Sequence, residues 1–206
     1  MNLLRVLCVL FYASALGFAE PTLRITSPVD GVVVNPGQTV KVTVEASGGP
    51  FQAVFIIGHY SIGATRPLAV PPYEFDVYIP EKIQPGKYLI TARGSTSPGH
   101  GARSKSVVLM VERADEPTKL RVQPSGLYGM LVGDKGHPQV EGIFGEGEVV
   151  QLTASKRTEY SSMDPKIASV EEYGIVTALS PGSTTLVVTY GKLKVEVPIK
   201  VLNKPR

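Results

Sequence analysis

The sequence of 206 residues has no tryptophan and a single cysteine, Cys8, which lies in a leading segment that we expect to be removed. The mature chain would then have no disulfide, and hydrophobic cores alone must hold each domain. Only three histidines occur, and no G-x-S-x-G or H-E-x-x-H spacing is present. We interpret His59, His100 and His137 as exposed loop residues. The absences predict no catalytic residue, no zinc site and no enzyme activity.

An excess of either charge is also missing. Lysine and arginine together number 21, against 18 aspartates and glutamates. Without Arg5, which belongs to the leading segment, 20 basic residues remain against the same 18 acidic ones, a net charge of about +2. A balance this close to neutral gives no reason to expect a nucleic-acid or an anionic membrane partner.

Residues 1–19 have the pattern of a secretory signal peptide. A single cation at Arg5 precedes a largely apolar run from Val6, and small residues stand at Gly17 and Ala19. The run is shorter than the roughly 20 residues of a membrane span, although an uncleaved anchor is the alternative. We therefore expect an extracellular, cell-surface or periplasmic protein whose mature chain does not insert into a membrane.

Short runs of alternating side chains, separated by turn residues, fill residues 22–112. In the run that starts at Thr39, valines and polar residues alternate, which is the period of a half-buried strand. The more continuous apolar run AVFIIG, from Ala53, predicts a central strand buried on both faces. About seven such strands and no useful helical period predict an immunoglobulin-like β-sandwich. The other runs are PYEFDVYIP from Pro72, PGKYLITARG from Pro85 and SKSVVLMVE from Ser104.

The stretch from Tyr160 to Tyr190 has the same organisation in its clearest form. Three runs rich in β-branched residues are separated by EEYG, which ends at Gly174, and by SPGS around Pro181 and Gly182. Proline presets φ for the second position of a turn and glycine supplies the positive φ of the third, so we predict a type II turn at Pro181 and Gly182.

This stretch resembles the bacterial immunoglobulin-like group 2 domain, which occurs in adhesins of the intimin and invasin kind. The resemblance covers about residues 118–202 and implies a fold, while it leaves the ligand open. Residues 22–112 resemble, more loosely, a bacterial Ig-like or fibronectin type III-like domain. The segments that carry the closer resemblance are GIFGEG at 142–147, QLT at 151–153, SSMDP at 161–165, IASV at 167–170, GIVTA at 174–178, PGSTTL at 181–186 and VEVPIKV at 195–201.

We therefore predict an all-β protein with two Ig-like β-sandwich domains in tandem after a signal peptide. The domains would span residues 22–112 and 119–202, with a linker at 113–118 and a tail at 203–206. Because the linker RADEPT is short and charged, we expect it to be solvated, with the domains end to end and limited bending between them.

Three local features carry further predictions. Pro-Gly precedes a strand at 36–37, 85–86 and 181–182, and the last two should occupy equivalent places in the two domains. Tyr88 could form a tyrosine corner, or it could be an ordinary core aromatic. Pro198 has no N–H to donate, so its strand should be an edge strand or have an interrupted ladder.

A partner surface is expected among exposed aromatic and basic residues in turns, namely Tyr60, Arg66, Tyr128 and Tyr173. The loop GHYSIGATRPLAVPP, residues 58–72, is the longest irregular stretch and the first candidate. Partial burial at the rim of a sandwich is the competing interpretation for each tyrosine.

Calcium is the one metal for which ligands could be found. Asp115 and Glu116 in the linker and Asp134 in the following domain could offer oxygen ligands. Since no EF-hand or repeated Asp-Gly pattern occurs, we favour solvated linker charges and predict no cofactor.

The leading hypothesis is a secreted or cell-surface, non-enzymatic protein with a structural, adhesive or protein-binding role. The alternative is a carbohydrate-binding accessory protein, and a third hypothesis is a subunit of a secreted enzyme. The partner would accordingly be a protein or a surface polysaccharide.

Overall fold

The computed structural model describes residues 19–204, and its regular secondary structure is almost entirely β-strand. Strands and loops account for the described chain except for one short 3-10 turn, η1 (Glu172–Gly174). This confirms the predicted fold class. The predicted signal peptide, apart from Ala19, and the last two residues of the tail lie outside the described residues. No helix of residues 19–204 is long and apolar enough to cross a membrane.

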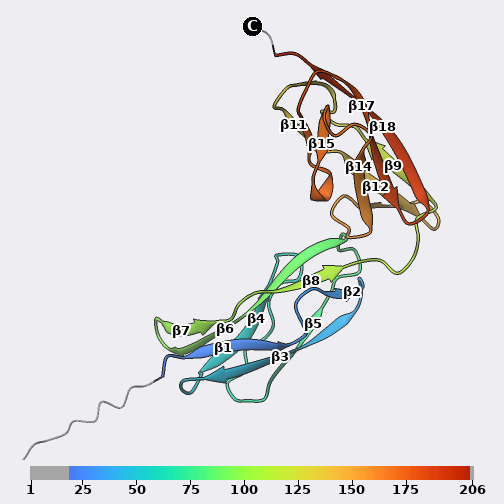
Figure 1. Cartoon of the computed structure of the whole chain (residues 1–206). Helices are drawn as coiled ribbons and strands as arrows, with labels where there is room; N and C mark the ends of the chain where they lie inside the picture. Colours follow the sequence, from blue (N-terminus) through green and yellow to red (C-terminus); the bar gives the residue numbers. More distant parts are fainter. Residues whose placement is uncertain (1–18, 205–206) are drawn as a thin grey trace, which may run out of the picture.

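The N-terminal half, residues 19–112, consists of two sheets that enclose a hydrophobic core. One sheet has the strand order β1-β3-β5, and the other has the order β2-β8-β6-β4, with β7 paired to β6. Figure 1 shows these strands in blue to green. The bounds are β1 (Thr22–Ser27), β2 (Val32–Val34), β3 (Thr39–Ser47), β4 (Ala53–Gly58), β5 (Tyr73–Tyr78), β6 (Gly86–Ser97), β7 (His100–Arg103) and β8 (Val107–Val111).

The C-terminal half, residues 113–204, has a core of its own that shares no buried residue with the first. Its sheets have the orders β13-β12-β9, β10-β18-β17-β14 and β11-β16-β15. The bounds are β9 (Lys119–Gln123), β10 (Tyr128–Leu131), β11 (Lys135–Gly136), β12 (Gln139–Phe144), β13 (Glu148–Gln151), β14 (Thr158–Ser162), β15 (Ala168–Val170), β16 (Val176–Ala178), β17 (Gly182–Tyr190) and β18 (Leu193–Leu202).

Alternation in the sequence corresponds closely to burial in the strands. In β5, Tyr73, Phe75 and Val77 are buried while the residues between them are exposed. The three valines predicted for one face of β3 are buried in the same way. Burying a side chain of this size contributes about 1.5 to 3 kcal/mol relative to leaving it exposed, so these periodic positions hold each sheet on its core.

The run from Ala53 to Gly58 is not the central strand that its apolar character predicts. It forms β4, the outermost strand of its sheet, and only Val54 and Ile56 are fully buried. The loop that follows covers its outer edge through backbone hydrogen bonds, which join Val54 to Leu68 in both directions and Thr65 to Ile56. The run is therefore apolar because one face of β4 packs on the core and a loop covers the outer edge of the strand.

Of the three Pro-Gly pairs, the first forms the turn predicted for the third. Gly37 has φ of +79°, and the Gln38 N–H donates to the Asn35 carbonyl at 3.1 Å, as in a type II turn. Gly86 and Gly182 have φ of +151° and +156° and each begins a long strand. The type II prediction at Gly182 is therefore wrong, whereas the equivalence of Gly86 and Gly182 is confirmed.

The last strands differ in part from what the sequence predicts. The three runs of the Tyr160–Tyr190 stretch each form a strand, as predicted, but β15 and β16 pair with each other while β17 lies in another sheet. β18 is an inner strand at Lys200–Leu202, where β10 joins it, and has β17 as its partner on the other side. Pro198 lies just before that segment, so the edge prediction holds only for the first part of the strand.

Candidate functional site

The four residues predicted for a partner surface lie in separate settings. Tyr60 is 90% exposed in the loop after β4, and Arg66 is an exposed residue of the same loop. Tyr128 is 77% exposed in β10, where it lies opposite Lys200 of β18 in the same half. Tyr173 is partly buried in η1 with φ of +62°, and the Lys87 ammonium lies 4.9 Å from its ring centre. The first three thus present free side chains, while Tyr173 belongs to the contact between the halves.

The predicted calcium ligands are engaged separately. The Asp115 carboxylate accepts two hydrogen bonds from Arg113, both at 2.8 Å, and Glu116 pairs with Arg157. Asp134 accepts a hydrogen bond from the Leu131 N–H within its own turn. Within residues 19–204 no group of three or more histidine, cysteine, aspartate or glutamate side chains is arranged to hold a metal ion.

Two of the three histidines border the meeting place of the halves. His59 and His137 line an open depression of about 660 Å³ together with Gln84 and Gln151. The His59 ring lies 5.3 Å from that of Tyr88 and edge-on to it. The Tyr88 hydroxyl donates to the Gln84 carbonyl at 2.8 Å, which confirms the tyrosine corner.

A buried carboxylate links the two halves. Glu112 is the last residue of the N-terminal half and is only 5% exposed. Its carboxylate accepts a hydrogen bond from the Ser155 hydroxyl and another from the Lys156 N–H, each at 2.6 Å. Because both donors belong to the turn before β14, Glu112 fixes that turn against the end of the N-terminal half.

Two arginines extend this network along the linker. Arg113 donates to Asp115 and to Glu148, and its guanidinium carbon lies 4.4 Å from the centre of the Phe144 ring. Arg157 donates to the Arg113 carbonyl at 3.0 Å and pairs with Glu116. The linker carboxylates are therefore exposed to solvent, as expected, and are in addition held in ion pairs.

The ion pairs also change acidities in the linker. The hydrogen bonds to Asp115 raise the pKa of the Arg113 guanidinium above its ordinary value, and the same bonds lower the pKa of the Asp115 carboxyl. Both groups therefore favour their charged forms, which strengthens the pairing between them.

Contacts beyond the linker join the two halves a second time. The Gln84 side-chain carbonyl accepts a hydrogen bond from the Gln151 N–H at 2.9 Å, and Lys87 pairs with Glu172 at 3.0 Å. A Cβ atom on Gly86 would lie 3.3 Å from the Cβ of Ala154, so β6 begins with close contact to the other half. We call all of these contacts, with those of Glu112, Arg113 and Arg157, the junction.

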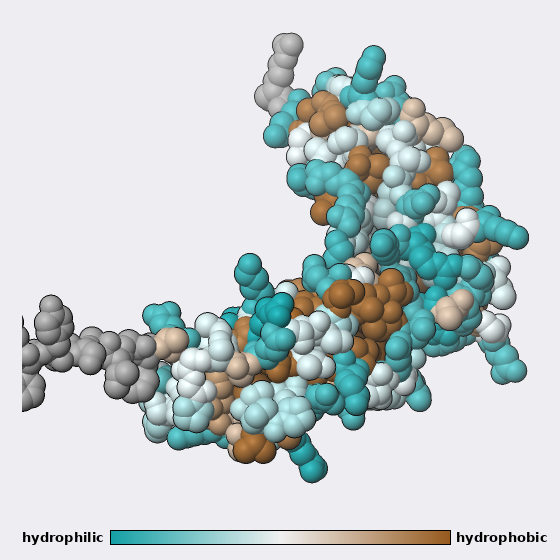
Figure 2. Space-filling view, turned by 60° about the horizontal axis from the view of Figure 1, so that its bottom comes forward, coloured by the Kyte–Doolittle hydropathy of each residue, from teal (hydrophilic) through white to brown (hydrophobic). Residues whose placement is uncertain are grey.

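The junction also covers apolar surface. Met110 of β8 is buried, and it lines a hollow of about 390 Å³ shared with Lys156 and Tyr173 of the other half. Figure 2 shows hydrophobic residues gathered on the N-terminal half beside the C-terminal half. The halves meet end to end with a bend between them, as Figure 1 shows.

A second candidate site lies at the end of the N-terminal half that Figure 1 places away from the junction. Here Phe55, Arg93 and Arg103 come from β4, β6 and β7 and lie directly opposite one another in the strand register. Since their chain neighbours Val54, Ile56 and Ala92 are buried, this row is on the outer face of the sheet. We call the row the Phe-Arg-Arg row.

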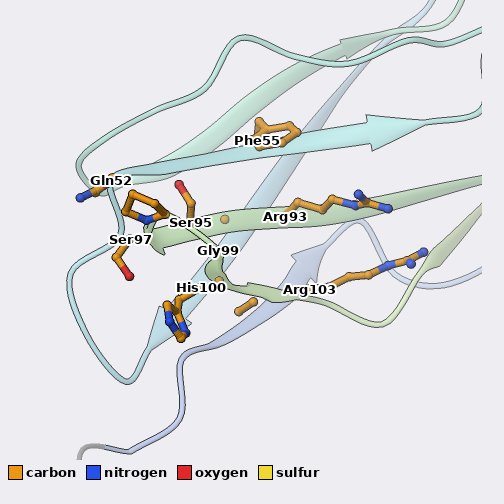
Figure 3. A pocket seen from close by; sticks show the side chains of 12 residues that line it. Gln52, Phe55, Arg93, Ser95, Ser97, Gly99, His100 and Arg103 are labelled. Carbon is orange, nitrogen blue, oxygen red and sulfur yellow. The ribbon is translucent and has the colours of Figure 1, made fainter.

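The Phe-Arg-Arg row borders an open depression of about 700 Å³, shown in Figure 3. Gln52, Ser95 and His100 line the same depression, and no acidic residue does. Among the described residues neither Arg93 nor Arg103 takes part in an ion pair or a side-chain hydrogen bond. The depression is therefore lined by free cations, an aromatic ring and neutral hydrogen-bonding groups.

Glycine keeps this surface hollow. A Cβ atom on Gly101 would lie 2.2 Å from the carbonyl oxygen of Gly94 on the paired strand, so no side chain fits at this position of β7. At the tip of the hairpin Gly99 has φ of +79°, a conformation that glycine adopts without strain. The short strand β7 can thus lie close to β6 and bring Arg103 beside Arg93.

The comparisons with known proteins concern the fold. Residues 148–201 match the family model of the bacterial Ig-like domain (group 2). No curated protein matches the chain. Among solved structures, fibronectin(III)-like modules of CbhA from Clostridium thermocellum are 20% identical, with a TM-score of 0.36, over 43% of this chain and 93% of theirs.

Two further structures illustrate the range of matches. Domains 4 and 5 of the S-layer protein SbsC are 17% identical, with a TM-score of 0.33, over 72% of this chain and 76% of theirs. β-Glucuronidase 3 of Bacteroides uniformis is 12% identical, with a TM-score of 0.37, over 88% of this chain but only 25% of the enzyme. At these identities and scores, nothing about ligand or activity transfers to this chain.

Proposed function

We propose that this chain, in which residues 148–201 carry a bacterial Ig-like group 2 domain, is a non-enzymatic binding protein built as a stiff two-domain rod. In this proposal the domains are residues 22–112 and 119–202, and the protein is exported to the cell surface, the periplasm or the medium. The C-terminal domain acts as a spacer, and the far end of the N-terminal domain presents the binding face.

The observation that carries the proposal is the junction. Domains joined by a short linker usually move relative to each other unless their interface is substantial. Here the linker pairs with both sides, and a separate set of contacts at Gln84, Gly86 and Lys87 joins β6 to the C-terminal half. Because the two sets lie on different parts of the interface, rotation about the linker would break one of them.

The buried position of Glu112 strengthens the case. A hydrogen bond to a charged group contributes about 1.5 to 3 kcal/mol, and a buried carboxylate that lost its donors would also bear its desolvation cost. Such a residue is unsuited to a hinge, because each opening of the junction would expose Glu112 or leave its carboxylate without hydrogen-bond donors. A fixed angle between domains is what a spacer or a structural module requires.

Residual dipolar couplings test the proposal. If the rod is stiff, the couplings of both halves fit one alignment tensor with the orientation seen in Figure 1. Glu112→Ala should reduce the tensor magnitude of one half relative to the other. Equal tensors in that variant, or unequal tensors in the unaltered chain, would contradict the proposal. Fractionation of the native cell tests the location, and recovery of the protein in the cytoplasm would refute export.

A further inference from the structure

We infer that the depression bordered by the Phe-Arg-Arg row binds an anionic polysaccharide, whose carboxylate or sulfate groups are held by Arg93 and Arg103 and whose sugar ring rests on Phe55. The inference rests on the proposed function only in treating the chain as a binding protein. It does not depend on the stiffness of the junction, which concerns the other end of the same half.

The arrangement of the arginines points to an anionic ligand. Arg93 and Arg103 are cross-strand partners, and like charges directly opposite each other on a sheet repel. Several other arginines of the chain are paired with carboxylates, for example Arg24 with Glu45 across β1 and β3. Two adjacent guanidiniums with no acidic neighbour in the lining offer several N–H donors to an external carboxylate or sulfate, which they can hold in bidentate fashion.

Phe55 indicates that the anion belongs to a sugar. Its ring is partly exposed on the outer face of β4, directly beside Arg93. An aromatic ring next to cations offers a ligand an apolar surface beside positive charge. The C–H face of a pyranose ring can stack on such an aromatic ring while its anionic group contacts the cations. Gln52 and Ser95 line the same depression and add neutral donors and acceptors, as the hydroxyl groups of a sugar require.

Other polyanions fit these features less well. Nucleic acid binding needs a basic stripe that follows the phosphates, whereas this chain has a net charge of only +3 and the depression carries two arginines. An acidic peptide would use the cations but has no need of the aromatic platform or of several neutral hydroxyl-binding groups. The wide opening of the depression admits an internal segment of a polymer as well as its end.

Binding of a defined polymer to the full chain tests the inference. Polygalacturonate, a uronic acid polymer, is titrated by isothermal calorimetry, beside neutral dextran and poly-L-glutamate of matched charge. We expect binding of polygalacturonate that weakens as sodium chloride is raised from 50 to 300 mM, no binding of dextran, and at least tenfold weaker binding of poly-L-glutamate. Equal affinity for poly-L-glutamate, or tighter binding of DNA than of polygalacturonate, would overturn the inference.

Variants then assign the site. Arg93→Gln and Arg103→Gln should each weaken binding about tenfold, since each removes charge-assisted hydrogen bonds. Phe55→Leu keeps apolar volume but removes the ring, and it should weaken polygalacturonate binding while leaving the weak binding of poly-L-glutamate unchanged. Arg24→Gln, which removes the same charge from the other sheet, is the matched control and should bind as the unaltered chain does.

The outcomes separate this inference from the proposed function. Absence of polygalacturonate binding at 50 mM salt, or equal affinities of Arg93→Gln and Arg24→Gln, would refute the site while the dipolar couplings still report a stiff rod. Unequal alignment tensors together with intact binding would refute the rod and leave the site. Circular dichroism and thermal unfolding of each variant establish that it is folded before affinities are compared.

Discussion

Replacement of Glu112 tests the energetic basis of the junction. Its carboxylate accepts two hydrogen bonds at 2.6 Å, from the Ser155 hydroxyl and the Lys156 N–H, in a buried setting. Glu112→Gln keeps the shape and one carbonyl acceptor but loses the charge and the second acceptor. With about 1.5 to 3 kcal/mol for a charge-assisted bond, we expect a cost of about 2 kcal/mol. Glu112→Ala loses both bonds and should cost about 3 kcal/mol.

Amide hydrogen exchange of Lys156 is the direct assay, because this N–H donates to Glu112. Its exchange rate reports the free energy of opening the contact. A loss of about 2 kcal/mol corresponds to roughly thirtyfold faster exchange in Glu112→Gln, and one of about 3 kcal/mol to more than a hundredfold in Glu112→Ala. The effect should be confined to the junction, with amides in the centres of both cores unchanged.

The matched control is Glu45→Gln, which removes the same charge from an exposed ion pair with Arg24. Exposed pairs contribute about 0 to 1 kcal/mol, so exchange at Lys156 should not change. If Lys156 exchanged at the same rate in Glu112→Gln as in the unaltered chain, the hydrogen bond would contribute nothing and the argument for a fixed junction would fail.

Three further predictions concern stability in urea denaturation. Arg103→Gln should raise the free energy of unfolding by about 0.5 kcal/mol at low salt, because it relieves repulsion from the arginine opposite, and no gain would mean that the charges are not coupled. Gly182→Ala should cost about 2 kcal/mol, since φ is +156°, a conformation that a residue with a Cβ rarely adopts; a neutral result would contradict the strand geometry. The hydrogen bond from Arg121 lowers the pKa of Glu141 in the folded state, so this group stabilises the fold above the ordinary glutamate pKa of about 4.3 and loses that effect as pH falls through the lowered value. Glu141→Gln should therefore be less stable than the unaltered chain at pH 7, and the difference should shrink below about pH 4; a constant difference from pH 7 to pH 3 would refute the assignment.

Features that depend on neighbours along the chain could be predicted from the sequence. Alternation located the buried faces of β3 and β5, and the tyrosine after Pro85-Gly86 forms the predicted corner. The error at β4 has a physical cause. An apolar run looks the same whether a second strand or a loop covers its edge, and the covering loop, residues 58–72, contains no recognisable strand.

Features that depend on register could not be predicted. Arg93 belongs to the predicted run PGKYLITARG, whereas Arg103 lies outside every predicted run, and only the pairing of β6 with β7 brings the two together. The alternation of PGKYLITARG does place Arg93 on the face opposite Ile90 and Ala92, which was the one available signal. Glu112 gave no signal, because its donors are 43 and 44 residues farther along the chain.

The distance between two spin labels across the junction tests the central claim most directly. Labels are attached at Lys41→Cys on β3 and Ser161→Cys on β14, both exposed positions, with Cys8→Ser so that no other thiol is present. A stiff rod predicts one narrow distance distribution by double electron–electron resonance, which broadens in Glu112→Ala. A broad or multiple distribution in the chain with Glu112 intact would show that the two halves move freely, and it would contradict the account.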